Sequence, residues 1–163
     1  MLIAGQWVDS ENGETADILN PANGEVIATT PKATLADVER CVNASREAFN
    51  NPEWKNIDPA QRGRILNKMA AATYANAKSL AVIESTNNGK TFREALSEIR
   101  FGAWTLEYFA GLADKNEGST IPVPGNRLNY TLRQPLGVTA HIVPWNFPLQ
   151  LAIRSIAPAL ASG

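Results

Sequence analysis

One long helix is the strongest structural signal in this sequence. Thr91-Phe92-Arg93-Glu94 begins it, and seven apolar residues then recur at alternating intervals of four and three. That spacing places side chains on one face of a helix, and such a face is normally buried in a protein core. We therefore predict a helix packed along this seam and assign the seam to the core rather than to a cofactor site. The seam consists of Phe92, Leu96, Ile99, Ala103, Leu106, Ala110 and Ala113.

Short strands and turns are expected before the helices begin. Asn23-Gly24 lies between Ile18-Leu19 and Val26-Ile27. An Asn-Gly pair favours a tight hairpin turn because both of its residues tolerate a positive φ. The sequence therefore predicts a β-hairpin near the N-terminus.

Two further helical regions should precede the long helix. Thr34 and Asp37 have the spacing of a capping box, and Asp58-Pro59 combines a capping residue with a proline in the first turn. Asn88-Gly89 is expected to end the second region. Its predicted apolar stripe consists of Ile65, Leu66, Met69 and Thr73.

The chain changes character after Gly118. Leu128 to Arg133 alternates apolar and polar residues, and Val138 to Val143 is mainly apolar, so we predict a strand in each segment. Phe147 to Ala161 is predicted to be a helix, with a kink or break at Pro158. A strand, a tight turn and a helix are the units of α/β proteins, in which ligands bind at the carboxyl end of the strand. The predicted fold class is α/β.

Composition excludes several classes of function. The formal net charge is -1, from 15 basic and 16 acidic residues, so we expect no nucleic-acid partner and no anionic-membrane partner. Cys41 and His141 are the only cysteine and histidine, which excludes an internal disulfide and argues against a metal site. Cys41 is expected to be a buried structural residue. No apolar run approaches the roughly 20 residues that span a bilayer, and the N-terminus lacks secretory features, so a cytoplasmic location is expected.

The turn after the second predicted strand carries the candidate site. Pro144 and Pro148 fix the backbone on either side of Trp145 and Asn146, and a rigidly displayed polar side chain suits binding or catalysis. Asn is also a common helix N-cap, so Asn146 could serve only to cap the following helix. Spacing alone leaves both interpretations open.

A resemblance to a known family bears on this choice. Pro144-Trp145-Asn146-Phe147-Pro148-Leu149 is similar to the PWNFPL motif of NAD(P)-dependent aldehyde dehydrogenases. Further blocks occur in the order and spacing of that family, and their joint order is far more specific than any one of them. These blocks are residues 4–8, 20–25, 88–90, 135–138 and 158–161.

The resemblance implies roles for the residues of the turn. Aldehyde dehydrogenases attack a small-molecule aldehyde with a cysteine thiolate and pass hydride to NAD or NADP. Asn146 matches the asparagine whose side-chain amide stabilises the developing oxyanion. Phe147 matches an aromatic position of the substrate tunnel. The residues matching positions that line the cofactor site are Ile142, Val143, Pro144 and Trp145.

The resemblance also implies that much of the enzyme is missing here. The family's nucleophile, its general-base glutamate and its later cofactor contacts correspond to positions beyond Gly163. Residues 1–163 then represent an incomplete N-terminal cofactor-binding domain, truncated after its first strand–helix unit. Residues 127–136 match the strand of the oligomerisation arm, which implies a homo-oligomer formed through the segment around Tyr130. The alternatives are an inactive fragment that docks on full-length subunits and an unrelated helical interaction module.

Two departures from the family pattern affect finer expectations. Arg154 to Pro158 is most similar to members acting on aromatic aldehydes, and Ser155 stands where many members have a lysine with a relay role, so that role is not transferred. Asn87 stands where some members have an aspartate near a monovalent-cation site. No metal is therefore predicted.

Overall fold

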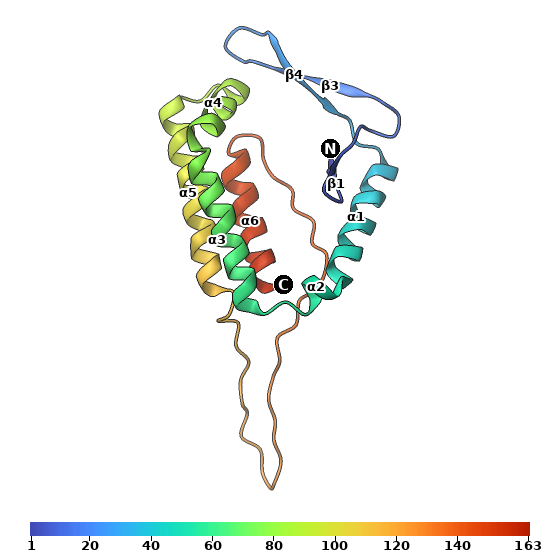
Figure 1. The fold of residues 1–163 in the computed structure, drawn as a ribbon, viewed down its shortest axis with the longest axis vertical. Helices are drawn as coiled ribbons and strands as arrows, with labels where there is room; N and C mark the ends of the chain where they lie inside the picture. The colour runs from blue at the N-terminus through green and yellow to red at the C-terminus, as the bar shows by residue number, and fades with distance from the viewer.

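The computed structural model describes residues 1–163, which form a group of packed helices flanked by two small sheets and a long protruding loop (Figure 1). In chain order the elements are β1 (Leu2–Ile3), β2 (Gln6–Trp7), β3 (Thr15–Leu19), β4 (Val26–Pro31), α1 (Leu35–Asn50), α2 (Pro52–Lys55), α3 (Pro59–Ala75), α4 (Ala77–Asn88), α5 (Phe92–Leu112) and α6 (Pro148–Ser162). No helix is both long enough and apolar enough to cross a membrane.

Local capping signals fix where the helices begin. Thr34 and Asp37 form a complete capping box at α1, and Thr91 forms one with Glu94 at α5. Asp58 accepts a hydrogen bond from the Ala60 N–H at the start of α3. These contacts satisfy backbone N–H groups that the first helical turn leaves without partners. The predicted helix starts are therefore confirmed.

The main core lies where α3, α5 and α6 meet, and alanines let these helices approach closely. Its buried residues are Leu66, Ala70, Leu106, Ala110, Ala113, Ile153, Ala157 and Ala161. A second cluster joins α4 to the first half of α5 through Ala77, Ala81, Ala95 and Ile99. The α5 seam is confirmed from Ile99 to Ala113, whereas Phe92 at its start is exposed. Helix α5 thus joins the two clusters.

Two helix predictions need correction. On α3 the buried residues are Gly63, Leu66 and Ala70, so the predicted stripe of Ile65, Leu66, Met69 and Thr73 is wrong except for Leu66. The contact with α5 favours small side chains, which a search for large apolar residues overlooks. Of the kink or break expected at Pro158, the break is wrong, because α6 continues to Ser162, and the kink stays a prediction.

The N-terminal hairpin is confirmed, although its turn is longer than expected. Strands β3 and β4 pair antiparallel, and the turn is closed by the hydrogen bond from the Asn20 N–H to the Glu25 carbonyl. Gly24 has a positive φ of 75°, whereas Asn23 does not. The Asn-Gly pair therefore ends a longer loop instead of forming a two-residue turn.

The two strands predicted after Gly118 are wrong as regular strands. Residues 138–143 belong to no hydrogen-bonded sheet, and residues 128–133 contribute only an isolated bridge between Tyr130 and Thr120. A strand needs a neighbouring strand to satisfy its N–H and C=O groups, and no other strand of the chain pairs with residues 138–143. Both segments follow an extended path nonetheless.

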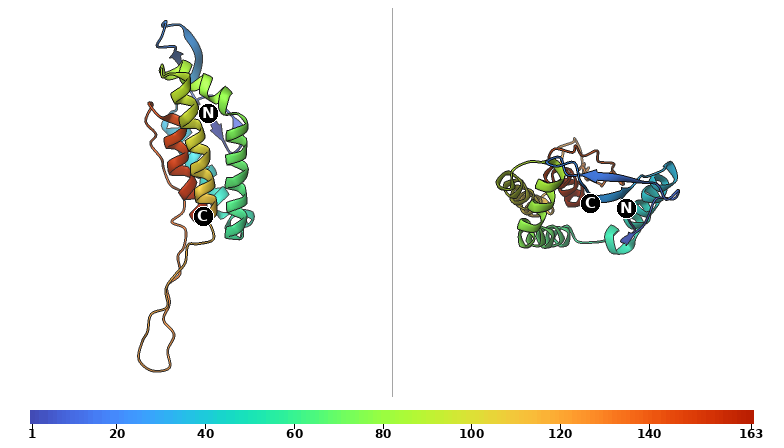
Figure 2. Two further views of the ribbon diagram at one scale, coloured as in Figure 1. Left: turned by 90° about the vertical axis from the view of Figure 1, so that its left-hand side faces the viewer. Right: turned by 90° about the horizontal axis from the view of Figure 1, so that it is seen from above.

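Residues 114–135 form a long loop that projects from the body of the molecule (Figure 2). Its two limbs are held together by a few hydrogen bonds, including Ile121 N–H to the Asn129 carbonyl and Thr131 N–H to the Ser119 carbonyl. Leu128 and Leu132 are 77% and 71% exposed. The loop presents apolar side chains to solvent far from any core of the chain.

The accessible surface is large for a chain of this size. It measures 11423 Å² for a mass of 17.6 kDa, whereas a compact monomer of that mass exposes about 7900 Å². The excess arises from the projecting loop, the separated α1 helix and the extended segment that runs beside α6 (Figure 1).

Candidate functional site

The candidate site is the turn that leads into α6. Phe147 is the N-cap of this helix, and no side chain caps the helix by a hydrogen bond. The amide of Asn146 makes no hydrogen bond within the chain, and Asn146 is exposed. The hypothesis that Asn146 serves as the helix cap is therefore wrong. The structure instead leaves both its side-chain amide donors free.

Prolines account for the shape of this turn. Pro148 occupies the first position of α6, where its missing N–H costs nothing and its fixed φ suits the helix. The first helical bond then runs from the Leu151 N–H to the Phe147 carbonyl at 2.9 Å. Asn146 thus lies immediately before the N-cap residue Phe147, at the end of the extended segment.

Lys90 anchors the turn to the rest of the protein. Its Nζ donates a hydrogen bond of 2.7 Å to the main-chain carbonyl of Asn146 and lies 4.5 Å from the centroid of the Phe147 ring. The same ammonium donates to Glu84 Oε1 at 2.9 Å and to Glu98 Oε2. One lysine therefore links the end of α4, the first half of α5 and the turn before α6.

The surroundings of Lys90 explain its charge state. Burial lowers the pKa of its ammonium, but the hydrogen bonds that it donates to Glu98 and Glu84 outweigh burial and raise that pKa above its usual value. Burial raises the pKa of Glu84, whose side chain is only 4% exposed. Lys90 is thus a permanent cation at neutral pH between two carboxylates.

The residues proposed to line the cofactor precede Asn146 in the extended segment. Ile142 and Trp145 are 100% and 80% exposed, and Val143 is 36% exposed. The backbone groups of Ile142 to Trp145 make no hydrogen bonds within the chain. The segment therefore offers apolar side chains and free carbonyl and N–H groups on an open surface.

The single cysteine of the chain is not part of this turn. Cys41 lies on α1, which is separated from α6 (Figure 1). Its burial is intermediate, so the expectation of a buried cysteine is wrong. The side chain of His141 pairs with the Thr139 hydroxyl at 2.9 Å and lies on the extended segment.

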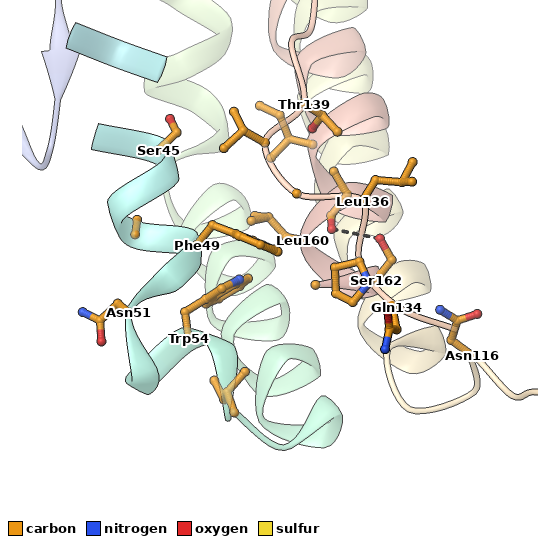
Figure 3. Close-up of a pocket in the computed structure, with 18 of the residues that line it drawn as sticks. Ser45, Phe49, Asn51, Trp54, Asn116, Gln134, Leu136, Thr139, Leu160 and Ser162 are labelled. Atoms are coloured by element: carbon orange, nitrogen blue, oxygen red, sulfur yellow. Dashed lines mark hydrogen bonds between the residues drawn. The ribbon is translucent and has the colours of Figure 1, made fainter. Parts of the chain in front are cut away.

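A cavity elsewhere in the structure is a separate feature. It measures about 1050 Å³ and lies between α1, α2, the segment 132–141 and the second half of α6. Phe49, Trp54, Leu136 and Leu160 form its apolar walls (Figure 3). Asn146 and Phe147 do not line it, so it is not the site of the chemistry suggested by the turn.

The sequence analysis missed the role of Lys90, Glu84 and Glu98. Lys90 is 56 residues from Asn146 along the chain, so no local pattern connects them. The position of Glu84 could have indicated a buried carboxylate, because Glu84 follows Ala77 and Ala81 on the buried face of α4. A carboxylate on an apolar helix face requires a partner, and the nearby Lys90 is that partner.

Comparisons with known proteins agree on one family. The sequence profile of the aldehyde dehydrogenase family matches residues 7–163. Aldehyde dehydrogenase 1A1 of Rattus norvegicus is 42% identical over 165 residues, which cover all of this chain and 33% of the rat protein. Hydroxyisobutyraldehyde dehydrogenase of Mycolicibacterium austroafricanum is 42% identical over 163 residues, covering 100% of this chain and 32% of that protein.

Solved structures show the same relationship. A putative aldehyde dehydrogenase from Burkholderia cenocepacia superimposes with a TM-score of 0.97 at 40% identity, over 99% of this chain and 34% of that one. Betaine aldehyde dehydrogenase from Staphylococcus aureus in complex with NAD+ gives a TM-score of 0.95 at 39% identity, over 99% of this chain and 33% of that one.

The chain belongs to the aldehyde dehydrogenase family, because its sequence and its fold match members of that family along nearly all of its length. It corresponds to the N-terminal portion of its relatives and spans about a third of their length. The α/β fold class and the suspected family are thereby confirmed.

Proposed function

We propose that residues 1–163 supply the oxyanion-stabilising asparagine and part of the cofactor site of an enzyme that oxidises an aldehyde to a carboxylic acid with NAD or NADP. The observation that carries the proposal is the free amide of Asn146, held at the start of α6 without any capping role. Attack on an aldehyde carbon converts its oxygen to an oxyanion, which preorganised N–H donors stabilise. The Asn146 amide is such a donor.

The residues before Asn146 fit one wall of a dinucleotide site. Val143, Pro144 and Trp145 present exposed apolar surface, and unpaired backbone groups alternate with it from Ile142 onward. Flat aromatic and aliphatic surfaces with a few polar groups suit the rings of a nucleotide. When bound, the nicotinamide accepts the hydride that leaves the substrate carbon. The relatives' NAD+ complex supports this assignment.

Phe147 is proposed to contact the substrate. Phe147 is 38% exposed next to Asn146, and the Lys90 ammonium lies over its ring. An apolar ring beside the oxyanion donor favours the hydrocarbon part of an aldehyde. Aromatic aldehydes are our preferred class, on the resemblance of residues 154–158 to members that use them.

The projecting loop is proposed to mediate assembly. Tyr130 is 55% exposed between the exposed Leu128 and Leu132, on a loop without a core of its own. An exposed apolar segment with few internal hydrogen bonds is suited to pairing with another subunit. A homo-oligomer formed through residues 127–136 follows. A cytoplasmic location stays a prediction.

The second candidate is a catalytically inactive chain that docks on full-length subunits through the same loop. It is favoured by the large exposed surface of the chain. Both candidates use the same loop, so only the chemistry separates them.

The experiment compares two polypeptides under identical conditions. A family-length protein carrying residues 1–163 at its N-terminus should form reduced cofactor from benzaldehyde and NAD+ or NADP+, whereas residues 1–163 alone should form none. Absence of turnover by the longer protein with aromatic and aliphatic aldehydes would overturn the enzyme assignment. Turnover by residues 1–163 alone would overturn the proposal that the site is incomplete.

A further inference from the structure

Two helices, α4 and α5, and the Asn146 turn are joined at a single, partly buried ammonium. Lys90 follows Gly89, whose positive φ of 80° ends α4 and directs the chain back toward α5. The Lys90 side chain is 14% exposed and the two carboxylates beside it are 4% and 15% exposed. An ammonium has three N–H donors, and here they serve Glu84, Glu98 and the Asn146 carbonyl.

The contact with Asn146 has an unusual consequence because it is made to the main chain. The Asn146 carbonyl accepts the only hydrogen bond that the chain donates to residues 142–146. It fixes the backbone of this residue while leaving the side-chain amide unpaired. The same ammonium faces the Phe147 ring, which is a favourable cation–π arrangement. Two consecutive residues of the proposed site are therefore held from one side.

The carboxylates hold the ammonium in place. Glu84 comes from α4 and Glu98 from α5, and both helices pack together through Ala81, Ala95 and Ile99. The position of the Lys90 Nζ is thus set by two helices rather than by the flexibility of its own side chain. An anchor set in this way can hold the turn to within a fraction of an ångström, which catalytic geometry requires.

We infer that Lys90 is a positioning residue: it holds the Asn146 carbonyl and the Phe147 ring so that the Asn146 amide is aimed at the reacting oxygen. The effect of Lys90 on catalysis rests on the proposed function. The restraint of the turn by Lys90 does not depend on that function and can be measured without substrate. Lys90 itself touches neither substrate nor cofactor in this account.

The alternative is that Lys90 has only a structural role, in which it neutralises Glu84 of α4 and Glu98 of α5. Lys90→Met alone does not separate the two, because it leaves two buried carboxylates facing each other and can unfold the chain. The triple variant Lys90→Met/Glu84→Gln/Glu98→Gln removes all three charges together and spares the core. Lys115→Met is the matched control, because Lys115 pairs with Asp114 at an exposed site.

The turn offers a direct probe in the Trp145–Asn146 bond. Chymotrypsin cleaves after exposed aromatic residues when the backbone can open locally. Cleavage after Trp7, which is 83% exposed, serves as the internal reference. The measured quantity is the rate of cleavage after Trp145 divided by the rate of cleavage after Trp7, in residues 1–163. This ratio should be about tenfold higher in the triple variant than in the wild type, and it should be unchanged in Lys115→Met. Helix content, followed by circular dichroism, confirms that the variants fold.

In the family-length enzyme the same triple variant should lower kcat by about ten- to a hundredfold, since a misplaced catalytic group costs rate. The KM for the cofactor should be little changed, and Lys90→Arg should recover part of kcat. Unchanged cleavage after Trp145 would overturn the restraint. Faster cleavage with an unchanged kcat would overturn the positioning role. A wild-type enzyme without aldehyde oxidation would refute the proposed function, while the cleavage rates would still decide whether Lys90 restrains the turn.

Discussion

A methyl group added at Gly63 should separate the two helices at the centre of the core. An ideal Cβ on Gly63 of α3 would lie 2.6 Å from the carbonyl oxygen of Ala110 and 3.6 Å from the Cβ of Ala113 on α5. Close carbon–oxygen contacts in proteins begin at about 3.3 Å, so the helices must move apart by roughly 0.7 Å. The obstacle is backbone, which cannot rotate away as a side chain can.

The cost follows from that displacement. Overpacking a core by one methyl group costs about 1–3 kcal/mol, whereas replacing Gly by Ala within a helix gains about 0.5–1 kcal/mol. Gly111 on the same α5 has open space around its hypothetical Cβ, so Gly111→Ala should show the gain alone. The two variants together isolate the clash. Gly63→Ala should be less stable than Gly111→Ala by about 1–3 kcal/mol.

Urea unfolding followed by circular dichroism compares the two variants of residues 1–163 at the same protein concentration, because association of the chain shifts the midpoint of unfolding. The slope of the transition should be the same for both variants, because neither changes how much surface unfolds. Equal midpoints for Gly63→Ala and Gly111→Ala would show that α3 and α5 do not approach as closely as described, and the reasoning would fail.

Three further outcomes are expected. Lys90→Met should lower the free energy of unfolding by up to about 3–5 kcal/mol, because it leaves the buried Glu84 and the partly buried Glu98 without their cation. Urea titration checks this beside the exposed Lys115→Met, which should change the free energy of unfolding by less than about 1 kcal/mol. The Thr34 N–H and other donors lower the pKa of Asp37, so its stabilising contribution is present above its usual pKa of about 3.9 and is lost as pH falls through the lowered value. Asp37→Asn should therefore flatten the fall of melting temperature with decreasing pH. The same fall in the variant and the wild type would contradict this. Residues 1–163 alone should form oligomers and bind a dye that reports apolar surface, because many large apolar side chains are exposed. Size-exclusion chromatography and calorimetry measure this. A monomer with a sharp thermal transition would refute the expectation.

The sequence predicted those parts of the fold that depend on neighbours along the chain. The capping residues Thr34, Asp58 and Thr91 and the terminating Gly89 are local signals, and the helices begin and end at them. The α5 seam was predictable because a long helix that is buried along one face has apolar residues at regular intervals in its sequence. Residues 138–143 were not predictable as they stand, because a strand forms only where another segment pairs with it.

The candidate site divides in the same way. Asn146 and its flanking prolines were recognisable from sequence, but the choice between capping and display needed the observation that Phe147 is the N-cap. The Lys90 anchor depends on a contact across 56 residues, for which the only local hint is the buried position of Glu84.

The account depends most on the claim that the Asn146 amide stabilises an oxyanion. In the family-length enzyme, Asn146→Ala should slow the single-turnover formation of reduced cofactor by about a hundred- to a thousandfold. Its melting temperature should stay close to that of Asn67→Ala, an exposed asparagine on α3, because neither side chain caps a helix. A near-normal single-turnover rate combined with a lowered melting temperature would contradict the account and return Asn146 to a purely structural role.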